Sequence, residues 1–457
     1  MSLRRALPLL AASAIAAAVL APDEARAAPS TGMSLARILE LAETNHPNVL
    51  AAQARLKQVR AQLDEAHFAP FSQFKLTGGF TVAPQIKGNA IFSPNTDASL
   101  TSSLGVAWRV GIDGIIPLWT FGKITNLWDA ASANVKVHEH DVDKERDAVR
   151  LDVRKAFFGL RFARDAQHLL GEVKKELEKA ETRAAAAAET DDGDPIELAQ
   201  VQAVSAEIEA RESEATRFEQ TALAGLRFYT GVATCDIADL PLSAPKHPLG
   251  HMTRYLTAAR LYRPEVQMAH AGIEARAAQV RMAHADLYPD VGLLLTAGLS
   301  AAPEIANVLN PYVSDPGNYF HYGAAIVFQW KLDFLPATAR VRFADAQLEE
   351  MRATEQLALG GVGTEVEIAY DEVQDWKKRS EAYGKAVSAS KRWLILVSQG
   401  IDVGTKETKD LIEPAKSYAL NKVNQLNALF EYNMAMARLA KATGWDSIAP
   451  DGEPPSP

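Results

Sequence analysis

The chain has 457 residues, of which 47% are hydrophobic and 23% charged, and its 48 basic and 57 acidic residues give a formal net charge of −9. Its one cysteine, Cys235, excludes an intrachain disulfide framework and a cysteine-rich zinc site. No basic stretch stands out, which argues against a nucleic-acid partner. The abundance of alanine and the 7% of aromatic residues are typical of long helices rather than of a compact mixed enzyme.

The first 27 residues have the features of a signal peptide. Arg4 and Arg5 form a basic start, residues 7–21 are an apolar run, and Ala25 and Ala27 are the small residues that a signal peptidase reads, so we expect cleavage after Ala27. Beyond this segment no run approaches the ~20 apolar residues that a membrane helix needs. If the mature protein spans a membrane, it must do so with strands.

The sequence repeats itself at an offset that drifts from 217 to 213 residues. Near the start of each copy, His46-Pro47-Asn48-Val49 matches Arg263-Pro264-Glu265-Val266, and near the end Thr230-Gly231 matches Thr443-Gly444. An ordered series of such matches predicts an internal duplication. The first repeat is predicted over 28–231 and the second over 251–444, with a proline-rich linker over 232–250 and a C-terminal tail over 445–457.

Each repeat is predicted to begin with a helix, over 35–68 and over 252–287, in which alanine and charged residues recur at helical spacing. Pro47 and Pro264 mark an early break or a restart in these helices. The two repeats therefore begin with the same element.

Two strands follow in each repeat, with apolar residues at every second position. The four predicted strands cover ~73–83, ~103–113, ~290–300 and ~319–333. Segments of about ten residues with this alternation are typical of transmembrane barrels, whose apolar side chains face lipid. The residues predicted to face lipid are Phe74, Leu76, Val106, Trp108, Val110, Leu293, Leu295, Ile326 and Phe328. Sandwich strands with one solvated face would show the same alternation, but the export signal and the aromatic residues at the strand ends favour a membrane.

A long helix comes next in each repeat, over ~123–190 and ~337–399, and a return helix follows over ~195–230 and ~408–443. The first long helix contains no proline and at 1.5 Å per residue would span roughly 100 Å. Apolar residues recur in it at every seventh position, at Val142, Val149, Ala156, Ala163, Leu170, Leu177 and Ala184. A sustained heptad predicts helices packed side by side with a left-handed supercoil.

Four strands cannot close a barrel, and an open strand edge is not tolerated in hydrocarbon. Several copies of the chain must therefore contribute to one barrel: two copies would give eight strands with a filled interior, and three would give twelve with room for a pore. The small residues on the polar strand faces favour the wider barrel; they are Gly105, Gly111, Gly292, Gly298 and Gly323.

With these features the chain resembles the TolC family of outer-membrane efflux proteins. The resemblance rests on the duplicated element order, on Pro117-Leu118-Trp119 with Phe121-Gly122 at the exit of the second strand, and on the segment 400–413. It implies a mainly α-helical chain with membrane strands, assembled as a homotrimer with a twelve-stranded barrel in the cell outer membrane and a long helical tunnel in the periplasm. The implied partners are a periplasmic adaptor (membrane fusion) protein and an inner-membrane transporter. No enzymatic activity, metal or cofactor is implied.

The segment 400–413 looks like the turn at the periplasmic tip of this family. The acidic residues carried over are Asp410 and Glu413, which in a trimer would place six carboxylates at the constriction, where a ring of like charge repels anions and collects cations. Lys406 and Glu197 are candidates for a charge pair that locks the tip. The plainer interpretation is that all four are solvated helix residues.

Two departures from the family pattern affect this tip. Ile401 stands where close relatives have a tyrosine able to hydrogen-bond a neighbouring helix. Pro414 removes a backbone donor from what should be a continuing helix, and it disfavours helical geometry at Glu413. We therefore expect a tip that is bent or built differently.

The sequence thus predicts the channel component of a tripartite efflux or type I secretion system, a passive conduit across the periplasm and the outer membrane. The alternative is a periplasmic coiled-coil adaptor or structural protein whose strands form a soluble β domain. No catalytic constellation supports an enzyme. His138 and His140 lie about 200° apart on a helix and cannot share one metal ion.

Overall fold

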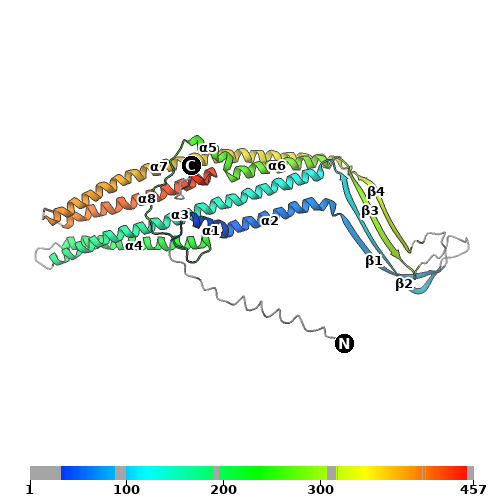
Figure 1. The fold of residues 1–457 in the computed structure, drawn as a ribbon, viewed down its shortest axis with the longest axis horizontal. Helices are drawn as coiled ribbons and strands as arrows, with labels where there is room; N and C mark the ends of the chain where they lie inside the picture. Colours follow the sequence, from blue (N-terminus) through cyan, green and yellow to red (C-terminus); the bar gives the residue numbers. More distant parts are fainter. Residues whose placement is uncertain are drawn as a thin grey trace, which may run out of the picture.

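The computed structural model describes residues 32–87, 99–188, 195–305, 315, 317–403, 405–406 and 408–449 (Figure 1). The predicted signal peptide, 1–27, and the end of the predicted tail, 450–457, lie outside the described residues. The described part is elongated, with a β-sheet at one end and long helices that run away from it (Figure 1). None of the helices in the described part is both long and apolar enough to cross a membrane.

Two repeats of six main elements follow one another along the chain, which confirms the predicted duplicated order. The first repeat contains α1 (Leu35–Asn45), α2 (Pro47–Phe68), β1 (Phe74–Lys87), β2 (Ser99–Trp119), α3 (Lys123–Ala188) and α4 (Pro195–Thr230). The second contains α5 (Met252–Tyr262), α6 (Pro264–Ala285), β3 (Asp290–Ala301), β4 (Tyr319–Gln329), α7 (Phe334–Asp402) and α8 (Ile412–Thr443). Short 3-10 helices in the described part are η1 (Ala69–Phe71), η2 (Thr408–Leu411) and η3 (Asp446–Ile448).

The repeats also end alike. Gly231 and Gly444 follow α4 and α8 with positive φ angles of 70° and 64°, the left-handed conformation that glycine adopts without steric cost. At Gly444 a Cβ atom would lie 2.6 Å from the carbonyl oxygen of Tyr262. The matched Thr-Gly pairs of the sequence are therefore matched helix ends.

The predicted opening helix of each repeat is in fact two helices. His46 and Arg263 have extended backbone, with ψ angles of 131° and 124°, because the residue before a proline is pushed out of the helical region. Pro47 and Pro264 then occupy the first position of α2 and α6, where a missing N–H costs nothing. Other boundaries differ less: β2 extends beyond the predicted 103–113 at both ends, β4 stops at Gln329 rather than 333, and α7 begins three residues before the predicted 337.

The long helices α3 and α7 organise the helical part (Figure 1). In the half nearer the sheet, α2 packs on α3, α3 on α6 and α6 on α7, whereas in the distal half α4 packs on α3, α3 on α8 and α8 on α7. The predicted heptad of α3 forms the seam, since all of its members except the half-buried Ala156 are buried. The buried side chains at every seventh position of α3 thus pack between the residues of the neighbouring helices and hold those helices side by side.

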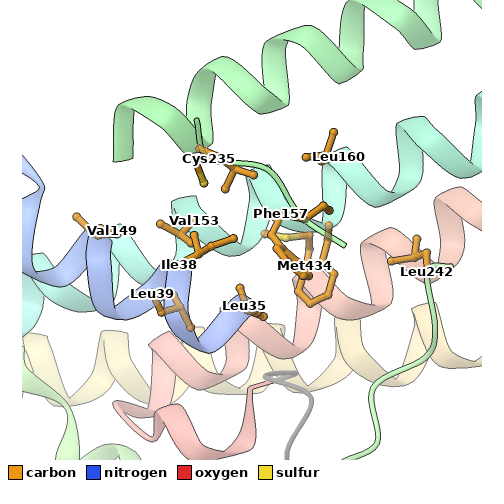
Figure 2. Close-up of a cluster of buried hydrophobic side chains, with 14 of the residues drawn as sticks. Leu35, Ile38, Leu39, Val149, Val153, Phe157, Leu160, Cys235, Leu242 and Met434 are labelled. Carbon is orange, nitrogen blue, oxygen red and sulfur yellow. The ribbon is translucent and has the colours of Figure 1, made fainter. Parts of the chain in front are cut away.

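A hydrophobic core lies midway along the helices, where α1 and the linker cover α3 and α8 (Figure 2). Ile38, Phe157, Leu160 and Met434 meet there, and Cys235 of the linker is buried among them. Burial raises the pKa of the Cys235 thiol, which leaves it protonated and unreactive. A second core repeats this arrangement around Tyr255, Val366, Met436 and Ile448.

Candidate functional site

The four strands form one antiparallel sheet in the order β1-β2-β3-β4. Its register places Leu76 opposite Ile112, Val110 opposite Leu299, and Leu293 opposite Ile326. Directly opposed residues of an antiparallel pair point to the same face. By this register all nine residues that the sequence predicts to face lipid share one face of the sheet.

That face is continuously apolar, and we call it the apolar face. Besides the nine predicted residues it contains Phe80, Val82, Leu104, Ile112, Ile116, Val291, Leu299, Phe320 and Tyr322. The side chains are largely uncovered: Phe80 is 84% exposed, Ile326 75% and Phe328 77%. Exposed apolar patches of this kind mark interaction sites or membrane contact.

The opposite face carries mainly polar and small residues, together with the apolar Ile115, Leu294 and Val327, and we call it the polar face. Its polar members are Lys75, Thr77, Thr81, Arg109, Asp113, Thr296, Ser300, Tyr319 and His321. Two of its glycines make room for neighbours: a Cβ atom at Gly298 would lie 2.3 Å from the His321 ring, and one at Gly105 would lie 2.9 Å from the backbone of Glu304. On this face Arg109 donates a hydrogen bond to the Tyr319 hydroxyl at 2.8 Å.

The sheet has two unpaired edges. In the described part of the chain, β1 pairs only with β2, and β4 pairs only with β3. Each outer edge therefore presents a row of backbone N–H and C=O groups without a ladder partner, the situation that favours pairing with another strand.

A sharp turn joins β2 to α3. Phe121 has a φ angle of 50° and Gly122 one of 92°, so a bulky residue is held in the left-handed region. The Phe121 ring stacks on Tyr288 with centroids 5.2 Å apart, and Lys123 bonds the Tyr288 carbonyl and the Asp290 carboxylate at 3.1 and 2.9 Å. These contacts tie the exit of β2 to the entry of β3 and fix the angle between sheet and helices.

The distal end of α7 closes in a tight turn. The backbone N–H groups of Thr405 and Lys406 both donate to the Gly400 carbonyl, at 2.8 and 3.2 Å. The Lys406 ammonium lies 3.9 Å from the Asp410 carboxylate, and both side chains are solvent-accessible. Of the predicted tip residues, the structure thus brings together Lys406 and Asp410, in an ion pair of the weak exposed kind.

The other predicted tip residues are Glu413, Glu197 and Ile401. Glu413 is exposed in the first turn of α8, where the helix dipole favours a carboxylate. Glu197 lies in α4, but its side chain is outside the described set, so the predicted lock with Lys406 stays a prediction. Ile401 lies in the last turn of α7.

The expectation for Pro414 is wrong in one respect. Glu413 is helical, and the helix break comes earlier, where η2 gives way to α8 at Ile412. Pro414 is then the third residue of α8, where a backbone N–H would have no intrahelical acceptor. The proline is accommodated because the helix starts late.

A groove of about 800 Å³ lies near the distal end, between α3, α7 and α8. Its lining combines apolar residues such as Leu177, Leu394 and Ile412 with charged ones such as Glu178 and Lys391. Sequence reasoning did not find it, because its walls combine α3 of the first repeat with α7 and α8 of the second.

An ionic cluster joins η3 to α3. Arg154, buried within α3, donates to both carboxylate oxygens of Asp446 at 2.7 and 2.9 Å. Arg150, one turn away, donates to Glu43 at 2.6 Å and to Asp147 at 3.0 Å. Burial raises the pKa of Asp147 to about 6, against the opposing charge of Arg150. Burial alone would raise the pKa of Asp446, but the hydrogen bonds and charge of Arg154 hold it below its usual value.

The family model described as "Outer membrane efflux protein" matches the chain over residues 38–232 and 256–445. The two matched segments correspond to the two repeats. No match was found among the curated proteins.

Solved outer-membrane channels share the fold. The OprN channel is 18% identical, with 90% of this chain and 89% of that chain covered and a TM-score of 0.73. The CmeC channel of Campylobacter jejuni is 17% identical over 92% and 87% of the two chains, with a TM-score of 0.71. The open-state MtrE channel of Neisseria gonorrhoeae is 18% identical over 90% and 88%, with a TM-score of 0.73.

Proposed function

Because the chain belongs to the family of outer membrane efflux proteins, whose TolC-like fold it shares, we propose that it is the outer-membrane channel of a tripartite efflux or type I secretion system. In this role it is a passive conduit that crosses the periplasm and the outer membrane. Its partners are further copies of itself, a periplasmic adaptor and an inner-membrane transporter.

The observation that carries the proposal is the combination of an exposed apolar face with two unpaired strand edges. A barrel in lipid must satisfy every backbone group, so it has no free edge. Pairing of β4 in one copy with β1 in the next removes both edges. Three copies then supply twelve strands, with the apolar face toward lipid and the polar face toward a lumen wider than that of an eight-stranded barrel.

The rival function, a periplasmic adaptor or structural protein with a soluble β domain, fits this sheet poorly. A soluble sheet buries its apolar face against a second layer. In the described residues the rings of Phe80 and Phe328 on the apolar face are 84% and 77% exposed, and no helix packs against the strands along their length (Figure 1). A lipid environment accounts for this exposure.

The distal tip supports a gated conduit. In a trimer, Asp410 and Glu413 from each copy place six carboxylates around the end of the helical tunnel, a charge pattern that admits cations and repels anions. Release of the Lys406–Asp410 pair would cost little, because an exposed ion pair is worth less than about 1 kcal/mol. This ion pair therefore presents only a small barrier to a partner that opens the tip by binding nearby.

The distal groove supports an adaptor as that partner. Its apolar floor and its charges of both signs suit the amphipathic face of a helical segment, which buries apolar anchors and pairs its charges at the rim. The groove lies on α3, α7 and α8 and is lined by Leu411 of η2, so a helix bound there lies next to the element that carries Asp410.

The test is assembly and conductance of the purified protein. We expect an outer-membrane trimer that resists detergent and changes gel mobility on heating, and that forms ion-conducting pores in planar bilayers. Ala325→Arg on the polar face provides a pore-lining variant with altered conductance. A monomer recovered from the periplasm without detergent, with no conductance in bilayers, would reject the channel and favour the adaptor.

A further inference from the structure

A second pocket lies midway along the helices, between the start of α1, α3, the linker and the C-terminal segment after α8. Its volume is about 610 Å³, within the range of about 300–1,000 Å³ that is typical of small-molecule sites. Leu35, Phe157, Phe158 and Leu240 give it apolar walls. It is remote from both the sheet and the distal tip.

Among the described residues that line it, the ionisable side chains are all basic: Arg161, Lys246 and His247. Burial and the nearby charge of Arg254 lower the pKa of His247, so this imidazole is mainly neutral at pH 7. Arg161 and Lys246 then give the described part of the pocket wall a positive charge.

Arg161 is held in place but has no acceptor. Its guanidinium carbon lies 4.6 Å from the centroid of the Phe157 ring, and its Nε atom is buried without a hydrogen-bond partner. Within the described residues the side chain makes neither a hydrogen bond nor an ion pair, and burial lowers the pKa of Arg161 while the charge of Asp165 raises it. The Asp165 carboxylate instead accepts a hydrogen bond from the Leu242 backbone at 2.8 Å.

The next arginine along α3 shows the contrast. Arg164 donates to Glu219 at 3.0 Å, to Asp236 at 2.7 Å and to the Ile237 carbonyl at 3.1 Å. Its donors are used to fasten α4 and the linker to α3. A half-buried guanidinium left without acceptors, as in Arg161, is rare because the lost hydration is not repaid.

We propose that this pocket binds an organic monoanion with a carboxylate head and an apolar body of aromatic or short-chain size. The planar guanidinium of Arg161 matches a carboxylate in a two-point contact, Lys246 adds a second positive charge, and the rings of Phe157 and Phe158 contact the apolar body. A neutral molecule of the same shape leaves Arg161 unpaired and binds more weakly. This site is independent of the channel function and of the tip.

The proposal is tested by titrating the purified full chain, exchanged into an amphipathic polymer to remove micelles, with 2-naphthoate in a calorimeter. The neutral 2-naphthamide serves as the matched ligand. Arg161→Met keeps a side chain of similar length but removes the guanidinium, so we expect naphthoate affinity to fall at least about tenfold, as for a lost charged hydrogen bond, with naphthamide affinity much less affected.

The matched protein control is Arg217→Met. Arg217 also stacks on a phenylalanine, at 5.3 Å from the Phe218 ring, but lies on α4 outside this pocket, so naphthoate affinity should stay at the wild-type value. If Arg161→Met does not fold, Arg161→Lys keeps the positive charge without the planar guanidinium and should lower the affinity for naphthoate several-fold. Equal affinity of the wild type for naphthoate and naphthamide, or wild-type naphthoate affinity in the folded Arg161 variants, overturns the proposal.

Discussion

Arg154 and Asp446 are 292 residues apart in the sequence and form a two-point ion pair, with N–O distances of 2.7 and 2.9 Å. The Arg154 side chain is only 2% exposed, so its charge is compensated inside the protein rather than by solvent. Arg154 belongs to the first repeat and Asp446 follows the second. The pair thus fastens η3, which follows the second repeat, to the long helix of the first repeat.

Asp446→Ala should strongly destabilise the protein, because it removes the carboxylate that both terminal nitrogens of the buried Arg154 bind. Breaking a buried pair on one side costs roughly 3 kcal/mol or more. The matched control is Asp129→Ala, which removes the exposed Arg281–Asp129 pair of 3.3 Å and should cost at most about 1 kcal/mol. Urea unfolding followed by circular dichroism measures both. Equal losses in the two variants would mean that Arg154 finds another acceptor.

Asp147 gives this cluster a pH dependence. Its pKa is about 6 in the folded protein against the ordinary 3.8, mainly because of burial. A carboxyl group whose pKa is raised by folding stabilises the folded state fully below pH 3.8, and this contribution is lost as the pH rises through 6.

Asp147→Asn keeps a neutral side chain at every pH. It should therefore raise the midpoint of heat denaturation at pH 7.5 by a few degrees, corresponding to at most about 3 kcal/mol, and leave it nearly unchanged at pH 4. Asp129→Asn is the exposed control and should show no such difference between the two pH values. A stabilisation by Asp147→Asn that is equal at pH 4 and pH 7.5 would exclude titration of Asp147 as its cause.

The apolar face can be tested with adjacent residues of β4. Ile326 lies on the apolar face and Ala325 on the polar face. Ile326→Arg should impair outer-membrane assembly, because an arginine facing lipid near mid-membrane costs about 2–4 kcal/mol, and Trp108→Asp should act in the same direction. Ala325→Arg should assemble normally. The readout is the yield of detergent-resistant trimer in the outer-membrane fraction, and normal yield for Ile326→Arg would mean that the faces are assigned the wrong way round.

The features predictable from the sequence are those with a local period. The alternation in β1–β4 and the heptad of α3 are patterns among residues that are close together in the sequence. The element order, the shared face of nine strand residues and the buried seam could therefore all be inferred. The extent of β2 could not, because its pairing partners set it.

Contacts between segments that are distant in the sequence could not be predicted either. Lys123 and Asp290 are 167 residues apart, and nothing in either neighbourhood marks the partner. Pro414 shows the limit of a local rule: a proline disfavours helical geometry at the residue before it, but α8 begins at Ile412, so Glu413 is helical and Pro414 lies in the first turn.

The tip carboxylates give the sharpest test of the conduit. Asp410 lies 3.9 Å from Lys406, and Glu413 is exposed one turn later. If both line the constriction, Asp410→Lys with Glu413→Lys converts a ring of six negative charges into a positive ring in the trimer. Block of single-channel current by a multivalent cation such as hexamminecobalt should then be lost, because the cation is no longer concentrated at the pore end.

Glu349→Lys with Glu350→Lys makes the same charge change on exposed residues of α7 away from the tip and should leave the block intact. Block that persists in the tip variant removes Asp410 and Glu413 from the constriction without affecting the assignment of the barrel.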